Sequence, residues 1–169
     1  MSAIQEKASK LQEYLVKTRR QLHENPESSL KEFETAAFIQ KELTSFGVPF
    51  EKVGETGTLA IIKGGKGDGR TVLLRADIDA LELPDCTGKP YASKRPGLNH
   101  ACGHDAHTAI GLGTAKLLND IKDTFSGTVK IAFQPAEEIG AGAKQFVASG
   151  QIEDIDESFA IHVNSSLPV

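Results

Sequence analysis

The segment Thr71-Val-Leu-Leu-Arg75 constrains the fold more than any other part of the sequence. It is nearly all apolar and lacks the alternation of a half-exposed strand, so we expect a strand buried on both faces. Two aspartates, Asp77 and Asp79, follow it closely. Such a strand needs helices on both sides of its sheet, which favours an α/β architecture.

The flanking sequence supplies those helices. Apolar residues recur at helical spacing over residues 3–23. A second helix is expected to begin near Ser29, where Ser29-x-x-Glu32 has the form of a capping box, and to end at Gly47. Two more helices are predicted over residues 104–121 and 141–148.

Further strands are expected over residues 48–53, 58–63, 127–133 and 158–162. The glycine-rich stretch at 64–69 is predicted to be a turn, and it lacks the Lys-Ser/Thr of a phosphate-binding loop. Because a hairpin precedes the strand–helix–strand units, we expect a sheet of mixed direction. The long loop at 84–103 inside a compact domain is typical of a functional segment.

Composition narrows the class of protein. The 169 residues, 39% hydrophobic and 25% charged, suit one soluble domain. A net charge of -4 without a basic run disfavours nucleic-acid binding. No apolar stretch approaches the ~20 residues that span a bilayer, and the polar N-terminus resembles neither a signal peptide nor an anchor. A cytoplasmic protein is therefore the default expectation, and no disulfide is expected between Cys86 and Cys102.

Ionisable side chains collect just beyond the predicted strands. Asp77 and Asp79 follow one strand, Glu137 and Glu138 follow the next, and His162 ends the last. In open α/β sheets, ligands bind beyond the carboxyl ends of the strands. Three separate strands should therefore deliver carboxylates and an imidazole to one edge of the sheet.

The segment Asn99-His-Ala-Cys-Gly-His-Asp-Ala-His107 adds a thiol and three imidazoles within nine residues. Thiolate, imidazole and carboxylate are the ligands of zinc and similar divalent ions. Between Cys102 and His104, Gly103 allows the backbone to bend so that both side chains can face one ion.

Each feature also has a structural interpretation. The Glu137-Glu138 pair could be a helix N-terminus favoured by the helix dipole, His162 a core histidine and Cys102 a small buried apolar residue. These interpretations would all have to hold at the same sheet edge, which favours a functional site.

Three motifs resemble the signatures of the M20 metallopeptidase superfamily, in its amidohydrolase branch. They are Leu74-Arg-Ala-Asp-Ile-Asp-Ala-Leu81, His100-Ala-Cys-Gly-His-Asp-Ala-His-Thr108 and Phe133-Gln-Pro-Ala-Glu-Glu138. The resemblance implies metal-dependent hydrolysis of the amide bond of N-acyl amino acids. It also implies a three-layer α-β-α fold with a central mixed sheet, like that of the zinc peptidases.

The resemblance also implies residue roles. Two divalent ions (Mn, Zn, Co or Ni) would share four ligands from this chain: Cys102, His104, Glu138 and His162. Glu137 would be the general base. One of Asp77 and Asp79 would orient a metal-bound imidazole or sit beside the ions, and the sequence does not decide which. His107 and Asp105 would orient the metal-binding side chains through hydrogen bonds without binding metal themselves.

Complete members of this superfamily are longer, so residues 1–169 would be the N-terminal part of an incomplete catalytic domain. A lid and dimerisation domain and a returning segment with a last histidine ligand would be absent. We therefore expect this chain alone to be inactive. The resemblance is compatible with a homodimer of the full-length protein.

Two alternatives stay open. The chain could be a non-catalytic remnant that folds and binds metal weakly, which assays of hydrolysis and metal content on one sample would reveal. It could also be a thiol hydrolase with Cys102 as nucleophile and His104 or His107 as base, which would stay active in a chelator.

Overall fold

The computed structural model describes residues 3–164. The helices are α1 (Ala3–Ser9), α2 (Gln12–Glu24), α3 (Phe33–Phe46), α4 (His104–Asp120), the 3₁₀ helix η1 (Lys122–Thr124) and α5 (Gly142–Ala148). The strands are β1 (Phe50–Val53), β2 (Gly57–Lys63), β3 (Thr71–Asp77), β4 (Thr128–Gln134) and β5 (Glu157–Ala160).

The five strands form one sheet in the order β1-β2-β4-β3-β5. β1 and β4 both run antiparallel to β2, whereas β3 runs parallel to β4 and β5. The predicted mixed sheet is confirmed. Because β3, β4 and β5 are parallel, their carboxyl ends meet at one edge of the sheet.

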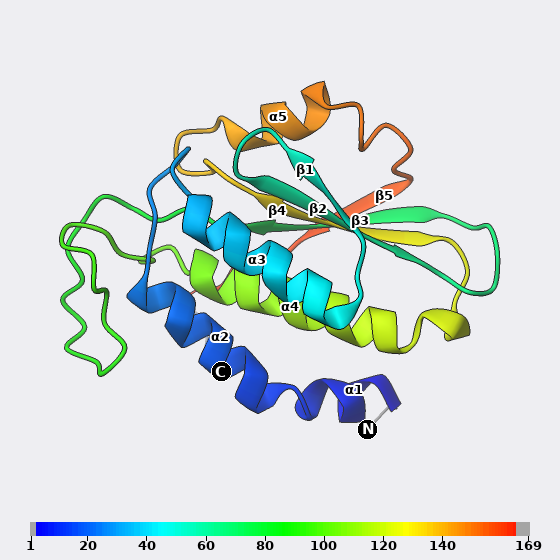
Figure 1. Cartoon of the computed structure of the whole chain (residues 1–169), viewed down its shortest axis with the longest axis horizontal. Helices are drawn as coiled ribbons and strands as arrows, with labels where there is room; N and C mark the ends of the chain where they lie inside the picture. Colours follow the sequence, from blue (N-terminus) through cyan, green and yellow to red (C-terminus); the bar gives the residue numbers. More distant parts are fainter. Residues whose placement is uncertain (1–2, 165–169) are drawn as a thin grey trace.

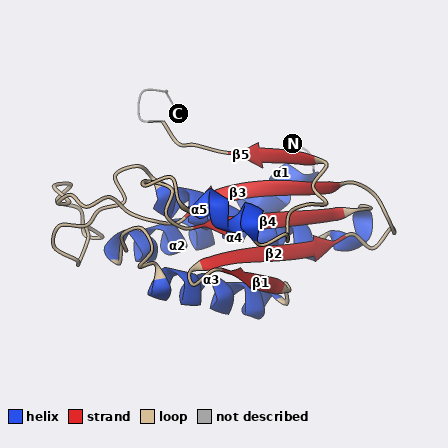
Figure 2. Ribbon diagram, turned by 90° about the horizontal axis from the view of Figure 1, so that it is seen from above, coloured by secondary structure: helices blue, strands red, loops and turns tan. Residues whose placement is uncertain are grey.

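Helices cover both faces of the sheet, which confirms the α/β fold with its layered helices. In Figure 1, α3 and α4 lie below the sheet with α2 outside them, and α5 lies above it. Viewed from above, α5 crosses β3 and β4 (Figure 2). The core between the sheet and the lower helices includes Ile39, Leu43, Leu112, Ile131 and Phe133, each fully buried. Each such side chain contributes about 1.5–3 kcal/mol through burial.

A smaller cluster packs under α5. It joins Val53, Leu59, Ala132 and Phe146, all buried. The strand predicted to be buried on both faces is only half-buried over its first five residues, Thr71 to Arg75. The seven-residue α5 is too short to cover the whole upper face, and the neighbouring strand β5 is exposed along its length.

The N-terminal helix prediction was wrong in one respect. The structure has two helices there, α1 and α2, which meet at residues 10–11. Towards the C-terminus, β5 ends at Ala160, so His162 lies two residues beyond the strand rather than at its end.

The capping-box prediction at Ser29 was also wrong. Helix α3 begins at Phe33, and its first amides are capped by the Glu27 carboxylate, which accepts hydrogen bonds from the backbone of Glu34 (3.2 Å) and Thr35 (2.7 Å). Leu30 adopts a φ of 65°, which turns the chain before the helix starts. Ser29 and Glu32 are free for other contacts as a result. The predicted end of this helix is confirmed, since Gly47 is its left-handed C-cap.

Candidate metal centre

The predicted convergence of side chains at one sheet edge is observed. Asp77 is the last residue of β3, and Glu137 and Glu138 follow β4 in the turn that leads to α5. His104 is the first residue of α4. Gly103, with a φ of 87°, precedes it in a left-handed conformation that glycine adopts without strain.

The imidazole of His104 is fully buried and has a fixed orientation. Its Nδ1 lies 2.9 Å from the Asp79 carbonyl oxygen and 3.2 Å from Asp79 Oδ1. Because both partners are acceptors, Nδ1 carries a proton, and in the neutral imidazole Nε2 therefore presents a lone pair. That Nε2 has no hydrogen-bond partner. Burial alone would lower the pKa of His104, but the hydrogen bond to Asp79 and the charge of Asp77 raise it above its usual value.

The two glutamates face this free nitrogen. Glu137 Oε2 lies 3.8 Å and Glu138 Oε1 3.7 Å from His104 Nε2. Glu138 Oε1 is buried without a hydrogen-bond partner, and burial raises the pKa of this carboxyl. The Glu137 side chain is 37% exposed, and its Oε1 lies 3.8 Å from a terminal nitrogen of Arg75.

Cys102 and His162 complete the cluster. Cys102 Sγ lies 3.4 Å from His162 Nε2, while His162 Nδ1 donates to the Val163 carbonyl (2.7 Å). The potential ligand atoms of Cys102, His104 and His162 lie within 4.8 Å of one another. Burial and the nearby Glu138 carboxylate raise the pKa of the Cys102 thiol to about 11.

Asp77 and His107 form a supporting pair. Asp77 Oδ1 accepts from His107 Nδ1 (2.5 Å), and His107 Nε2 accepts from the Val163 backbone (2.8 Å). Both nitrogens of His107 are therefore engaged. Asp77 Oδ2 lies 2.7 Å from Arg75 and 3.6 Å from His104 Nε2. Burial would raise the pKa of Asp77, but the hydrogen bond from His107 and the nearby positive charges lower it.

Asp105 faces away from this cluster, towards α2. Its buried Oδ2 lies 2.7 Å from both Arg19 Nε and His23 Nδ1. Burial would raise the pKa of Asp105, but the hydrogen bond from His23 lowers it. The neighbour of His104 in the sequence therefore attaches the start of α4 to α2.

The donor set fits a divalent cation. A buried imidazole lone pair and a buried carboxylate oxygen face each other 3.7 Å apart, and neither has a hydrogen-bond partner. Carboxylates, imidazoles and a thiol surround this point, and a cation there would offset the repulsion among the carboxylates. Nitrogen, oxygen and sulfur donors of this kind are ligands of first-row divalent metals.

Sequence reasoning assigned no role to several residues at this site. Arg75 contacts both Asp77 and Glu137, and Ser29 Oγ donates to Asp79 Oδ2 (2.7 Å). Glu32 contacts the turn that carries the glutamates. In the sequence, Ser29 and Glu32 stand out only because they have the spacing of a capping box, and that capping box does not form in the structure.

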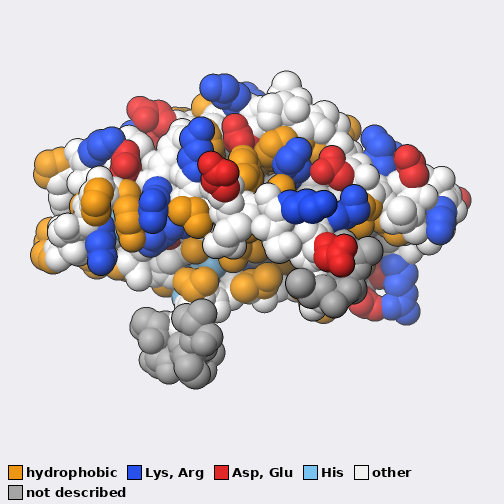
Figure 3. All heavy atoms as spheres, turned by 90° about the horizontal axis from the view of Figure 1, so that it is seen from below, with side chains coloured by type: hydrophobic (Ala, Val, Ile, Leu, Met, Phe, Trp, Pro, Cys, Tyr) orange, Lys and Arg blue, Asp and Glu red, His pale blue; other side chains and the backbone are white. Residues whose placement is uncertain are grey.

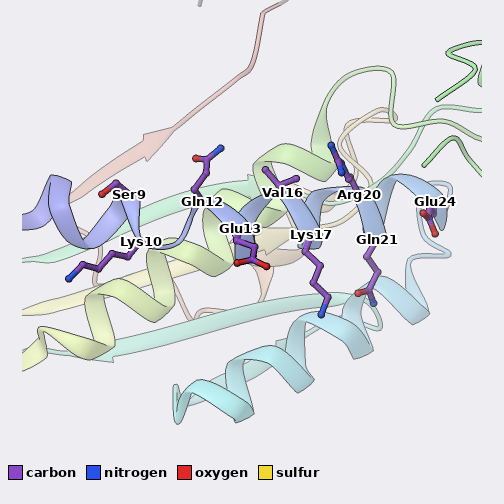
Figure 4. Close-up of a pocket in the computed structure, with 9 residues that line it drawn as sticks. All are labelled: Ser9, Lys10, Gln12, Glu13, Val16, Lys17, Arg20, Gln21 and Glu24. Carbon is purple, nitrogen blue, oxygen red and sulfur yellow. The ribbon is translucent and has the colours of Figure 1, made fainter. Parts of the chain in front are cut away.

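A large hollow in the described residues lies elsewhere. It measures about 880 Å³ and is formed by residues 9–24, along the outer side of α2 (Figure 4). None of its lining side chains is buried, and charges of both signs alternate along it, including Lys17, Arg20 and Glu24. The space-filling view from below likewise shows positive and negative side chains interspersed (Figure 3). This hollow is a solvated helix surface without a convergent set of reactive groups.

Relatives of known name match most of this chain. It is 46% identical over 162 residues to the N-acetyl-L-cysteine deacetylase of Bacillus subtilis, covering 95% of this chain and 39% of that protein. It is 44% identical over 156 residues to the IAA-amino acid hydrolase ILR1-like 5 of Arabidopsis thaliana, covering 92% and 35%. The chain thus spans about two fifths of the length of these curated relatives.

Solved structures share the fold. The YXEP protein of Bacillus subtilis, described as a dinuclear metal-binding peptidase, superposes with a TM-score of 0.91 at 43% identity, over 95% of this chain and 46% of that one. A putative aminohydrolase of methicillin-resistant Staphylococcus aureus gives a TM-score of 0.92 at 38% identity, over 96% and 44%. In the described residues, no helix is long and apolar enough to cross a membrane.

The sequence model of peptidase family M20/M25/M40 matches residues 73–169, which include the cysteine–histidine motif, both glutamates and His162. The resemblance inferred from the three motifs is confirmed. This chain belongs to peptidase family M20/M25/M40, and its relatives are metal-dependent hydrolases.

Proposed function

We propose that the protein containing this chain hydrolyses the amide bond of N-acyl amino acids with the aid of two divalent ions. The observation that carries the proposal is the unpartnered Nε2 of His104, which Asp79 holds towards the carboxylates of Glu137 and Glu138. The names of the bacterial and plant relatives support a small acylated amino acid as substrate. Within that protein, residues 1–169 would form the N-terminal part of the catalytic domain, to which a lid domain and a returning segment would be added.

Four residues of this chain would hold the ions: Cys102, His104, Glu138 and His162. When bound, divalent ions lower the pKa of water and polarise the scissile carbonyl. Asp79 would orient His104, because its backbone and side-chain oxygens both face Nδ1. Asp77 would contribute negative charge beside Nε2 and hold His107 in place.

Glu137 suits the general base. It is the more exposed of the two glutamates, at 37% against 19% for Glu138, so it can reach a substrate. A terminal nitrogen of Arg75 lies 3.8 Å from one of its oxygens and helps to orient the carboxylate. Glu137 would take a proton from the attacking water and deliver it to the leaving nitrogen.

The thiol-hydrolase alternative finds little support in the geometry. A cysteine nucleophile reacts as the thiolate, and the pKa of Cys102 is raised to about 11 by burial and by Glu138. The proposed bases His104 and His107 each direct Nδ1 at an aspartate oxygen. The non-catalytic remnant keeps the same ligands, so activity is what distinguishes it from the proposed enzyme.

The test compares two neighbouring substitutions. In the complete protein, Glu137→Gln should lower turnover of N-acetyl amino acids by at least ~100-fold, the scale of general-base catalysis, while metal content stays unchanged. Glu138→Gln should lower the metal content itself, which elemental analysis of this chain or the complete protein measures. The reverse pattern would contradict the two roles. A wild-type protein that retains metal but hydrolyses no N-acyl amino acid would favour the remnant.

A further inference from the structure

The turn that carries the two glutamates has an unusual backbone. Ala136, directly before Glu137, is fully buried and adopts a φ of 51°, a left-handed conformation that costs free energy in any residue with a Cβ. Its carbonyl accepts hydrogen bonds from the backbone of Ala141 (3.0 Å) and Gly142 (3.2 Å). Surrounding contacts must therefore stabilise this conformation.

One of those contacts comes from a side chain 104 residues away in the sequence. Glu32 Oε1 accepts a hydrogen bond from the Ala136 backbone N–H at 2.8 Å. Glu32 Oε2 accepts from Thr56 Oγ1 at 2.9 Å. The Glu32 side chain has no exposed surface, and burial raises the pKa of its carboxyl. A buried carboxylate is costly, so its presence here requires an explanation beyond packing.

The same turn has a second attachment. The backbone N–H of Glu138 donates to Asp79 Oδ2 at 3.0 Å. Two buried carboxylates, those of Glu32 and Asp79, thus bind the N–H groups on either side of Glu137. Ser29 supports the second of them through its 2.7 Å hydrogen bond to Asp79. Residues 29–32, which we call the anchor segment, therefore take part in both attachments: Glu32 accepts from the Ala136 N–H, and Ser29 donates to Asp79.

We propose that Glu32 is a positioning residue of the metal centre: its carboxylate fixes the left-handed turn at Ala136 so that Glu137 and Glu138 both face His104 Nε2. This inference rests on the proposed function for the identity of the ligands. A rotation about the Ala136 backbone would swing the next two residues, whose carboxylates now lie 3.8 and 3.7 Å from that nitrogen. Displacements of about 1 Å are enough to weaken such a site.

The proposal distinguishes substitutions of similar size. Gln at position 32 keeps an oxygen for the Ala136 N–H and can donate its amide to Thr56 Oγ1, which has lone pairs to accept it. Asp keeps the charge but is one methylene shorter, so it cannot reach both partners. Ala removes both hydrogen bonds. Metal affinity should therefore depend on whether the hydrogen bond to Ala136 is kept, and not on whether the side chain at position 32 is charged.

The experiment uses the 169-residue chain and two measurements. Hydrogen exchange of the Ala136 amide, followed by NMR on metal-free protein, reports the turn directly. Titration with Co²⁺ reports the affinity of the site. Glu32→Ala and Glu32→Asp should each lose protection at Ala136 and bind Co²⁺ about 10- to 100-fold more weakly, the usual effect of removing support behind a ligand. Glu32→Gln should keep the protection and bind within about threefold of wild type.

Leu43→Ala is the matched control, because Leu43 is a fully buried residue of α3 that is absent from the described contacts of the metal centre. It should lower stability while Co²⁺ affinity stays near that of wild type. The proposal is overturned if Glu32→Ala or Glu32→Asp keeps both protection and affinity, or if Leu43→Ala loses as much affinity as they do. A wild-type chain that does not bind Co²⁺ would refute the proposed metal site instead, and exchange at Ala136 would still decide whether Glu32 fixes the turn.

Discussion

The substitution Asp79→Asn tests how the imidazole of His104 is held. Asp79 is fully buried, and its carboxylate accepts from Ser29 Oγ (2.7 Å) and the Glu138 N–H (3.0 Å) while facing His104 Nδ1 (3.2 Å). Asparagine has nearly the same volume but only one oxygen. If that oxygen keeps Glu138 and Ser29, the new NH₂ group faces Nδ1. The Asp79 carbonyl (2.9 Å) is then the one described acceptor left for Nδ1, so the tautomer in which Nε2 carries the proton is more populated than in wild type. That tautomer cannot bind a metal ion through Nε2.

The size of the effect follows from these contacts. Removing the carboxylate behind a ligating histidine typically lowers metal affinity 10- to 100-fold, which corresponds to about 1.4–2.7 kcal/mol. The loss should lie within this range, because the substitution removes the carboxylate oxygen that faces His104 Nδ1 but keeps the contact with the backbone of Glu138. In metal-free protein, losing one charge-assisted hydrogen bond should lower the free energy of unfolding by about 1.5–3 kcal/mol.

Two assays separate these effects. Competition with a chromophoric chelator measures Zn²⁺ affinity, and ¹⁵N NMR of the imidazole identifies the tautomer of metal-free His104. Ser29→Ala is the control, because it removes one partner of Asp79 but leaves both carboxylate oxygens, so Zn²⁺ affinity should stay within about threefold. If Asp79→Asn binds Zn²⁺ as tightly as wild type, the assigned role of the Asp79 carboxylate is wrong. An unchanged tautomer population would show that the Asp79 carbonyl alone holds the proton on Nδ1.

Two further predictions concern Cys102 and Asp105. Burial and Glu138 raise the pKa of Cys102 to about 11. Alkylation of Cys102 in metal-free Cys86→Ser protein should therefore be slow at pH 8 and accelerate about tenfold per pH unit up to pH 10. A pH profile of the alkylation rate with its midpoint near 8.5 would contradict the raised pKa. Asp105→Asn should lower the free energy of unfolding in urea by about 2–3 kcal/mol, the low end for a buried pair because Arg19 is 35% exposed. The control is Asp154→Asn at an exposed ion pair, for which the free energy of unfolding should change by less than about 0.5 kcal/mol. Equal losses in the two variants would contradict the Asp105 prediction.

The sequence predicted the place of the site well because one physical rule applied. Ionisable residues after β3 and β4 were expected at a common edge, since the carboxyl ends of parallel strands meet there. The cysteine–histidine motif then had to lie near that edge, because it directly precedes the helix that connects the two strands. The roles of these residues stay predictions until metal content and turnover are measured.

The sequence could not distinguish Asp77 from Asp79. The two residues carry the same side chain and lie two positions apart at the end of one strand. The alternation of strand residues therefore places both on the same face and cannot separate their roles. Their partners differ only in three dimensions: Asp77 meets His107, whereas Asp79 meets His104 and the backbone of Glu138. The error at Ser29 has a similar origin, because Glu27, which is closer in space to the first amides of α3, caps the helix instead.

The N-terminal residues bear on the site although they supply none of its proposed ligands. Three contacts join them to it: His23 to Asp105, Ser29 to Asp79, and Glu32 to the backbone of Ala136. These pairs are separated by 82, 50 and 104 residues in the sequence. Such distant hydrogen bonds leave no local pattern, and the match to the family model begins only at residue 73. The groups that would bind metal are therefore concentrated in the matched region, whereas some of the groups that fix their geometry, such as Glu32, lie before it. The substitution Glu32→Ala should accordingly lower metal affinity without removing any ligand.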